Sequence, residues 1–187
     1  MTILYIKNMV CDRCIMVVQN ELKKLRIEIS NIKLGEVILE NELSDTKKLN
    51  LQKTLLSLGF ELIDNKKSRI IEQIKNQIID LVHNKNGDIK TNLSEVLSSE
   101  LNHDYKYLSN LFSEIEGTTI EKYFIAQRIE KVKELLVYDE LSLSEIAYKL
   151  NYSSVAYLSN QFKKVTGLTP SHFKQIKDNK RKPLDKV

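Results

Sequence analysis

The chain has 187 residues, of which 42% are hydrophobic and 29% charged, a composition typical of one or two globular domains. No run of residues approaches the ~20 apolar positions that a membrane span needs, and the first ten residues are too short and too polar for a signal peptide. We therefore expect a cytoplasmic protein with no membrane partner, whose two cysteines are thiols rather than a structural disulfide.

The net charge of +4 is distributed unevenly along the chain. Residues 1–65 carry 9 basic and 9 acidic side chains, residues 66–187 carry 20 and 16, and the last 38 residues carry 8 and 2. A local positive excess suits a polyanionic partner such as nucleic acid, although it can also act as a solubilising tail. Composition alone leaves both interpretations open.

Residues 1–64 alternate between strand-like and helix-like patterns. "ILYIK" is typical of a strand, apolar residues recur at helical spacing from Cys14, and two short alternating runs meet at Gly35. Leucines then share one helical face until Gly59, and "FELI" forms a last strand. The order β-α-β-β-α-β predicts an α+β domain of the ferredoxin-like class. Its boundary is expected at the polar stretch "DNKKS", which separates residues 1–64 from residues 65–187.

Residues 69–83 carry isoleucines and a leucine at near-heptad spacing. Because two heptads are too few for a stable coiled coil, this pattern favours a core helix of the second domain over a dimer zipper. A homodimer is left open.

An internal repeat dominates the second domain. Residues 93–119 and 143–169 align at an offset of 50, with 10 identities in 27 positions. Each copy predicts two short helices: the first begins at a capping box, Asn92 with Glu95 or Ser142 with Glu145. A turn at an asparagine follows, and the second helix of each copy ends at a glycine.

Two helices about a tight turn predict a helix-turn-helix motif, at about 91–117 and again at about 142–167. Between them, residues of about 119–138 contain neither glycine nor proline and predict one connecting helix. Such a helix is roughly 30 Å long, close to the ~34 Å between successive major grooves on one face of DNA. The expected target is an asymmetric duplex site read in two adjacent major grooves, without a dimer.

The segments "TTIEKYFIAQRIEKVKELL" and "LSLSEIAYKLNYSSVAYLSNQFKKVTGLTPSHFK" are similar to the connecting helix and second helix-turn-helix of AraC-type transcriptional regulators. The resemblance implies an all-α DNA-binding domain and a sequence-specific regulator that also contacts RNA polymerase. Many members of that family carry arginine where Asn110 and Asn160 stand, so base preference does not transfer from them.

By position, the resemblance assigns base contacts in the first groove to Lys106, Ser109 and Asn110, and in the second groove to Ala156, Tyr157, Ser159 and Asn160. Asparagine can pair with adenine through two hydrogen bonds. Phosphate contacts are expected at Lys163, Lys164 and Ser171. Because residues 88–118 hold 2 basic and 6 acidic side chains, we expect the second motif to anchor the complex.

Both cysteines lie in "NMVCDRC" at residues 8–14. The Met-x-Cys-x-x-Cys pattern, placed between the first strand and first helix, resembles the heavy-metal-associated (HMA) domain of copper chaperones and metal-pumping ATPases. It implies a metal site at Cys11 and Cys14. Two thiolates suit a soft ion such as Cu(I), Ag(I) or Hg(II), whereas Zn(II), which usually takes four ligands, fits less well. Met9 is expected in the core, and the nearby helix N-terminus is expected to lower the thiol pKa.

A redox pair and a purely structural pair are the alternatives for the two cysteines. The chain shows no nucleophile–base constellation or phosphate-binding loop, so we expect no enzyme and no catalytic or cofactor-binding residues. The overall hypothesis is a metal-responsive transcriptional regulator. A metallochaperone or detoxification protein whose helical domain binds protein is the alternative, as is a thiol-redox-responsive regulator. The metal, the operator, the sign of regulation, the oligomeric state and the coupling between domains are not determined by the sequence.

Overall fold

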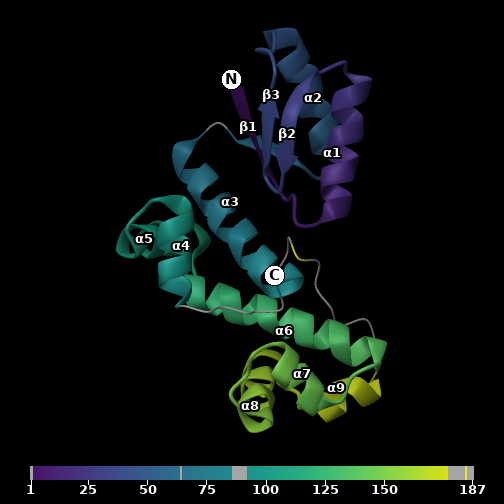
Figure 1. Ribbon diagram of the computed structural model, residues 1–187, viewed down its shortest axis with the longest axis vertical. Helices are drawn as coiled ribbons and strands as arrows, with labels where there is room; N and C mark the ends of the chain where they lie inside the picture. The colour runs from purple at the N-terminus through teal and green to yellow at the C-terminus, as the bar shows by residue number, and fades with distance from the viewer. Residues whose placement is uncertain (1, 64, 86–91, 177–183, 185–187) are drawn as a thin grey trace. The chain divides into compact units, whose positions relative to one another are not determined.

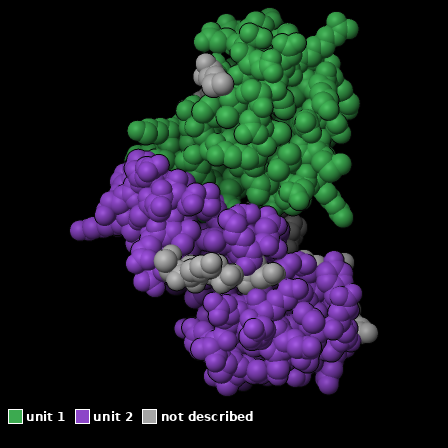
Figure 2. All heavy atoms as spheres, in the orientation of Figure 1, with its two compact units in different colours: residues 1–76 green, residues 77–187 purple. Residues whose placement is uncertain are grey.

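The computed structural model describes residues 2–63, 65–85, 92–176 and 184 (Figure 1). The chain divides into two compact units, Met1–Asn76 and Gln77–Val187, which are coloured separately in Figure 2. Within the described residues, no helix is long and apolar enough to cross a membrane.

Unit 1 follows the predicted order of strands and helices. Its elements are β1 (Thr2–Lys7), α1 (Asp12–Lys24), β2 (Ile29–Lys33), β3 (Glu36–Leu39), α2 (Asp45–Ser57), β4 (Glu61–Ile63) and the first part of α3 (Lys66–Ile79). The four strands form one sheet in the order β2-β3-β1-β4, and every neighbouring pair is antiparallel.

Period-2 alternation along β1 places its side chains on two faces of the sheet. Leu4 and Ile6 lie in the core that the sheet shares with α1 and α2, together with Val18 of α1 and Leu51 of α2. Met9 is fully buried in the same core, as its predicted structural role requires. The residue therefore anchors the segment that precedes the two cysteines.

The first part of α3 packs against the other face of this sheet, through polar contacts. The Arg69 guanidinium lies 4.7 Å from the centre of the Tyr5 ring. One turn further on, Gln73 Nε2 donates to Glu36 Oε1 of β3 at 2.7 Å. These contacts attach residues 66–76 to unit 1, which is green in Figure 2.

Asn76 completes the attachment at the β2–β3 hairpin. Its Nδ2 donates to the carbonyl of Leu34 at 3.3 Å, and a Cβ added to Gly35 would lie 2.2 Å from that nitrogen. The compact units thus divide inside α3, after Asn76, rather than at the polar stretch 64–68 where the sequence places the boundary. Helix α3 begins at Lys66, inside that stretch, and its residues 66–76 pack with unit 1.

Unit 2 consists of helices. The π-helical turn η1 (Asp80–Asn84) continues from α3, and the others are α4 (Leu93–Leu101), α5 (Tyr105–Glu116), α6 (Ile120–Tyr138), α7 (Leu143–Lys149), α8 (Val155–Thr166) and α9 (Pro170–Ile176). The pairs α4–α5 and α7–α8 occupy the two repeated segments, and α6 occupies the segment predicted as the connecting helix.

The two copies differ at their first helix cap. Ser142 and Glu145 form the full capping box, with Ser142 N donating to Glu145 Oε2 at 2.7 Å and Glu145 N to Ser142 Oγ at 3.3 Å. The box predicted for Asn92 and Glu95 is wrong, because the Asn92 side chain makes no capping bond. The Glu95 amide donates instead to the Asn92 carbonyl at 3.0 Å, so the main chain satisfies the amide that the side chain would have capped.

The predicted turns are confirmed by the backbone. Asn102 (φ 53°) and Asn151 (φ 54°) adopt the left-handed conformation that asparagine tolerates, and Gly117 and Gly167 end the second helices in the same conformation. The turn of the second copy is one residue longer. His103 alone separates Asn102 from the next N-cap residue, whereas two residues, 152 and 153, follow Asn151.

The core of unit 2 includes phenylalanines from both copies of the repeat. Phe112 and Phe162, at matching positions of the two copies, are fully buried. Phe112 packs on Tyr123 of α6 with 5.7 Å between ring centres, and Phe162 packs on Phe173 of α9 at 5.5 Å. In the segment 69–83 the near-heptad residues are buried, but Ile71 and Ile74 lie in unit 1 and only Ile78 and Leu81 in unit 2, so the segment is not a core helix of the second domain alone.

Candidate functional site

The outward faces of α5 and α8 carry the residues predicted to contact bases. Leu108 and Leu158 turn these helices' apolar faces inward and are fully buried. The predicted base-contacting residues all lie on the exposed or half-exposed faces: Lys106, Ser109 and Asn110 on α5, and Ala156, Tyr157, Ser159 and Asn160 on α8. The repeat therefore presents the same polar Ser-Asn pair at two places in unit 2.

The N-termini of the two helices differ in charge. Asp104 caps α5, its Oδ1 accepting from the Lys106 amide at 2.9 Å, whereas Ser154 caps α8, its Oγ accepting from the Tyr157 amide at 3.0 Å. A carboxylate neutralises the positive end of the helix dipole, and a hydroxyl leaves it available to an anion. The N-terminus of α8 is therefore better suited to bind a phosphate than the N-terminus of α5.

The predicted phosphate contacts lie on exposed positions of the second motif and of α9. Lys163 and Lys164 stand in the last turn of α8, where the first copy has Ser113 and Glu114. Ser171 is exposed at the start of α9, which begins at Pro170 as predicted. At these matching positions, the second copy of the repeat therefore carries two positive charges and the first copy one negative charge.

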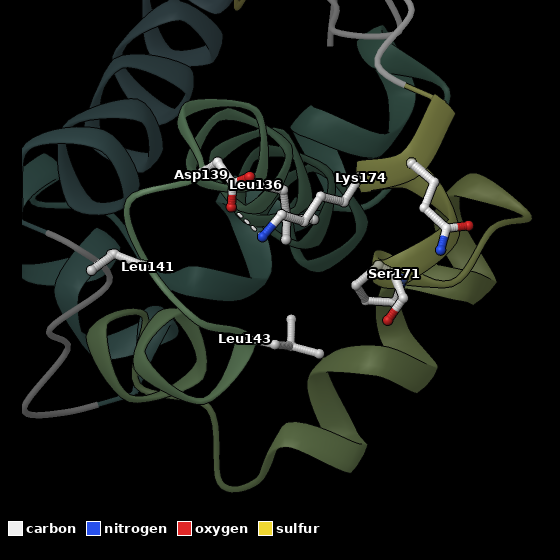
Figure 3. Close-up of a pocket in the computed structure, with 8 residues that line it drawn as sticks. Leu136, Asp139, Leu141, Leu143, Ser171 and Lys174 are labelled. Carbon is white, nitrogen blue, oxygen red and sulfur yellow. Dashed lines mark ion pairs between the residues drawn. The ribbon is translucent and has the colours of Figure 1, made fainter.

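Ser171 also borders a cavity of about 460 Å³ among the end of α6, the start of α7 and α9 (Figure 3). Leu136, Leu141 and Leu143 supply its apolar walls. Lys174 forms an ion pair with Asp139 across it, as the dashed line in Figure 3 marks. This pair joins α9 to the end of α6.

A cation on α6 contacts the turn of the second motif. Arg128 Nη2 donates to the Leu150 carbonyl at 2.6 Å, and its guanidinium carbon lies 3.8 Å from the centre of the Tyr152 ring. Tyr152 OH in turn donates to Gln161 Oε1 of α8 at 2.9 Å. No spacing or motif in the sequence predicts this chain of contacts, because its members come from three separate segments.

The cysteine pair lies at the beginning of α1. Cys11 is the N-cap residue, and its carbonyl accepts from the Cys14 amide at 2.9 Å. The two Sγ atoms lie 3.5 Å apart, and both residues are half-buried free thiols. Burial raises the pKa of the Cys14 thiol and outweighs the backbone amides that act to lower it, so the expected lowering by the helix N-terminus is not met at this residue.

Asn8 connects the cysteine segment to two other elements. It adopts a left-handed backbone (φ 70°), and its Nδ2 donates to the carbonyl of Gly59 at 2.9 Å. Its backbone also acts to lower the pKa of the carboxyl of Glu72, a buried residue of α3 that pairs with Lys75 at 3.5 Å. Among the described residues, no three His, Cys, Asp or Glu side chains form a metal-binding cluster. Sequence reasoning missed Asn8 and Glu72.

Known proteins and protein families show similarity to the helical unit of this chain. A family described as "Helix-turn-helix domain" matches residues 97–176. The uncharacterized transcriptional regulatory protein YesN of Bacillus subtilis is 33% identical over 110 residues, covering 58% of this chain and 29% of YesN. The uncharacterized HTH-type transcriptional regulator YtdP of the same species is 26% identical over 117 residues, covering 62% of this chain and 15% of YtdP.

Among solved structures, the C-terminal domain of AraT, a response regulator from Geobacillus stearothermophilus, is 28% identical with a TM-score of 0.51. The match covers 60% of this chain and 88% of that domain. The helical unit is an AraC-type helix-turn-helix DNA-binding domain.

In this AraC-type domain, α4–α5 and α7–α8 are the two helix-turn-helix motifs and α6 connects them. The matched segment is less than a third of the length of either regulator. The similarity to these two proteins is therefore limited to the helical domain.

Proposed function

We propose that the chain is a sequence-specific transcriptional regulator whose α5 and α8 read two adjacent major grooves of an asymmetric operator. The observation that carries this proposal is the duplicated motif itself. The same Ser-Asn pair stands on the exposed faces of α5 and α8, and α6, of 19 residues, connects the two motifs. At 1.5 Å per residue such a helix is about 28 Å long, which suits a separation of one turn of DNA.

In this proposal Asn110 and Asn160 select adenine through paired hydrogen bonds, and Tyr157 packs against a thymine methyl. Lys106, Ser109, Ala156 and Ser159 complete the two base-contacting faces. Lys163, Lys164 and Ser171 bind phosphates and position the domain without specifying sequence. The neutral cap at Ser154 and the lysines of α8 support the second motif as the electrostatic anchor.

The test is selection of duplexes from a random-sequence library by the full chain, followed by affinity measurement with competitor DNA. A regulator of this type selects a bipartite motif and binds it at least a thousandfold more tightly than competitor, the lower end of the range for specific DNA-binding proteins. Recovery of a motif with a single half-site would overturn the two-groove arrangement. Failure to select any motif would favour a helical domain that binds protein, as in a metallochaperone.

We further propose that unit 1 is a ferredoxin-like, HMA-like sensor that binds a soft metal ion through Cys11 and Cys14. The support is the βαββαβ order with strand order β2-β3-β1-β4, the buried Met9 and two thiols 3.5 Å apart on a half-exposed segment. Thiolate sulfur is a soft donor and prefers Cu(I), Ag(I) or Hg(II). Both thiols must lose their protons, so binding releases protons and weakens as the pH falls.

The contacts of Asn8 give this sensor a route to the rest of the chain. Asn8 is three residues before Cys11, and its backbone acts on the pKa of the buried Glu72 carboxyl of α3. Movement of the segment 8–14 on ion capture would change that electrostatic interaction, and α3 continues past the boundary between the two units. We propose that the interaction of Asn8 with Glu72 transmits metal binding to the DNA-binding domain.

The thiol contact also supports a redox-responsive regulator, because two Sγ atoms 3.5 Å apart need only a small movement to form a disulfide. One assay separates the two candidates. DNA affinity is measured for the reduced apo protein, the protein loaded with one equivalent of Ag(I), and the disulfide form. A change with Ag(I) alone supports metal sensing, and a change with the disulfide alone supports redox sensing.

A further inference from the structure

Helix α8 is connected to α6 through a set of side-chain contacts that has no equivalent at α5. The turn before α8 is one residue longer than the turn before α5, and the additional room is occupied by Tyr152, which is buried. In the first motif only His103 lies between the left-handed asparagine and the N-cap residue. Its ring packs on Tyr107 of α5, with 5.3 Å between ring centres.

Tyr152 is contacted on its face and at its hydroxyl. Arg128 stacks on the ring at 3.8 Å, and the hydroxyl donates to Gln161 Oε1, in the middle of α8, at 2.9 Å. The same arginine donates to the Leu150 carbonyl at the end of α7. The Arg128 side chain therefore contacts the end of α7 directly, and it contacts α8 indirectly, through Tyr152.

The contact needs arginine in particular. A planar guanidinium can stack on an aromatic ring and donate in its own plane at the same time, which a lysine ammonium cannot do. The contact is also costly, since Arg128 Nε is buried and has no hydrogen-bond partner among the described residues. Replacing this half-buried cation by an apolar side chain would remove the cost of its unpaired Nε, so stability alone does not account for its presence.

We propose that Arg128 is a positioning residue for DNA recognition: it sets the direction of α8 through Tyr152 and Gln161, so that Asn160 and its neighbours meet the second half-site. The inference rests on the proposed role of α8 as a base-contacting helix. In the first motif, the hydroxyl of Tyr105 donates to Glu121 of α6 and makes a simpler connection between α5 and the connecting helix.

The experiment uses the full chain and the duplex that the wild-type protein selects from a random library. Arg128→Met keeps an unbranched apolar stem and removes the guanidinium. We expect an unchanged or raised unfolding temperature, a loss of affinity of about tenfold, corresponding to one good base contact, and loss of hydroxyl-radical protection only in the half-site of α8. Wild-type affinity and protection in a folded Arg128→Met protein would overturn the proposal.

Two further variants keep the test decisive. Tyr152→Phe removes only the bond to Gln161 and should weaken the same half-site by a smaller factor, even where Arg128→Met fails to fold. Unchanged protection in folded Tyr152→Phe would then count against the proposal. Tyr105→Phe is the matched control, because it removes the tyrosine hydroxyl of the first motif and should affect only the other half-site. If the wild-type chain selects no duplex, the proposed function fails rather than this inference.

Discussion

The Sγ atoms of Cys11 and Cys14 lie 3.5 Å apart at the first turn of α1. Because both are half-buried thiols that no disulfide joins, we expect the chain to bind one equivalent of Ag(I) or Cu(I). Cys11→Ser/Cys14→Ser should abolish binding in a competition titration with a chromophoric chelator. Since serine replaces each thiol with little change in volume, the apo variant should unfold at the same urea concentration as wild type.

The hairpin glycine Gly35 is packed against α3, and a side chain there should destabilise unit 1. Gly35→Ala brings a Cβ to 2.2 Å from Asn76 Nδ2 at a left-handed φ of 75°, so we expect a loss of about 2–3 kcal/mol of unfolding free energy, combining backbone strain and overpacking. Gly59→Ala is the matched control. Its φ is 87° but nothing lies within 4 Å of the added Cβ, so strain alone should cost about 1–2 kcal/mol.

Asn76→Ala in the Gly35→Ala background tests the same contact from the other side. If α3 attaches to the hairpin as described, the second substitution should restore part of the lost stability in urea unfolding. An additive pair of losses would show that the two residues are not in contact in solution.

The two lysines at the end of α8 should account for part of the salt dependence of DNA binding. Lys163→Ala/Lys164→Ala should weaken affinity for every duplex alike and lower the slope of log affinity against log salt by about two, because each phosphate contact releases roughly one counterion. Lys23→Ala/Lys24→Ala changes the net charge equally, in the last turn of α1. It should leave the slope unchanged. Equal slopes for wild type and the α8 variant would contradict the anchoring role of the second motif.

Glu72 should make the stability of unit 1 depend on pH. Burial raises the pKa of this carboxyl, despite nearby Lys75 and Lys7 and the backbone of Asn8. The folded state therefore binds the proton more tightly than the unfolded state, and stability falls as the pH rises from the ordinary carboxyl range through the raised pKa. Glu72→Gln should thus be more stable than wild type at neutral pH and lose that advantage in acid. A difference that does not change with pH in urea unfolding would contradict the buried position.

The predictions that succeed from sequence depend on local rules. Asn102 and Asn151 mark turns because asparagine tolerates a left-handed backbone, and Gly117 and Gly167 end helices because glycine adopts the same conformation without strain. The capping box at Asn92 fails because the main-chain carbonyl takes the amide that the side chain would have capped, a choice that the four-residue pattern does not contain.

What the sequence does not reveal depends on tertiary contacts. The boundary inside α3 results from Gln73 and Asn76 bonding to a hairpin some forty residues earlier, beyond the reach of any periodic pattern. The raised pKa of Cys14 likewise depends on packing, since burial outweighs the helix terminus that the motif suggests. Arg128, Tyr152 and Gln161 come together from three segments for the same reason.

The central claim is that ion capture at the cysteines changes DNA binding. The most direct measurement is the affinity of the full chain for its selected duplex, by fluorescence anisotropy, with and without one equivalent of Ag(I). Metal-responsive regulation predicts a change of about fivefold or more, the lower end of typical allosteric coupling, that is lost in Cys11→Ser/Cys14→Ser and reduced in Glu72→Ala. Identical affinities for the apo and loaded wild-type protein would contradict it.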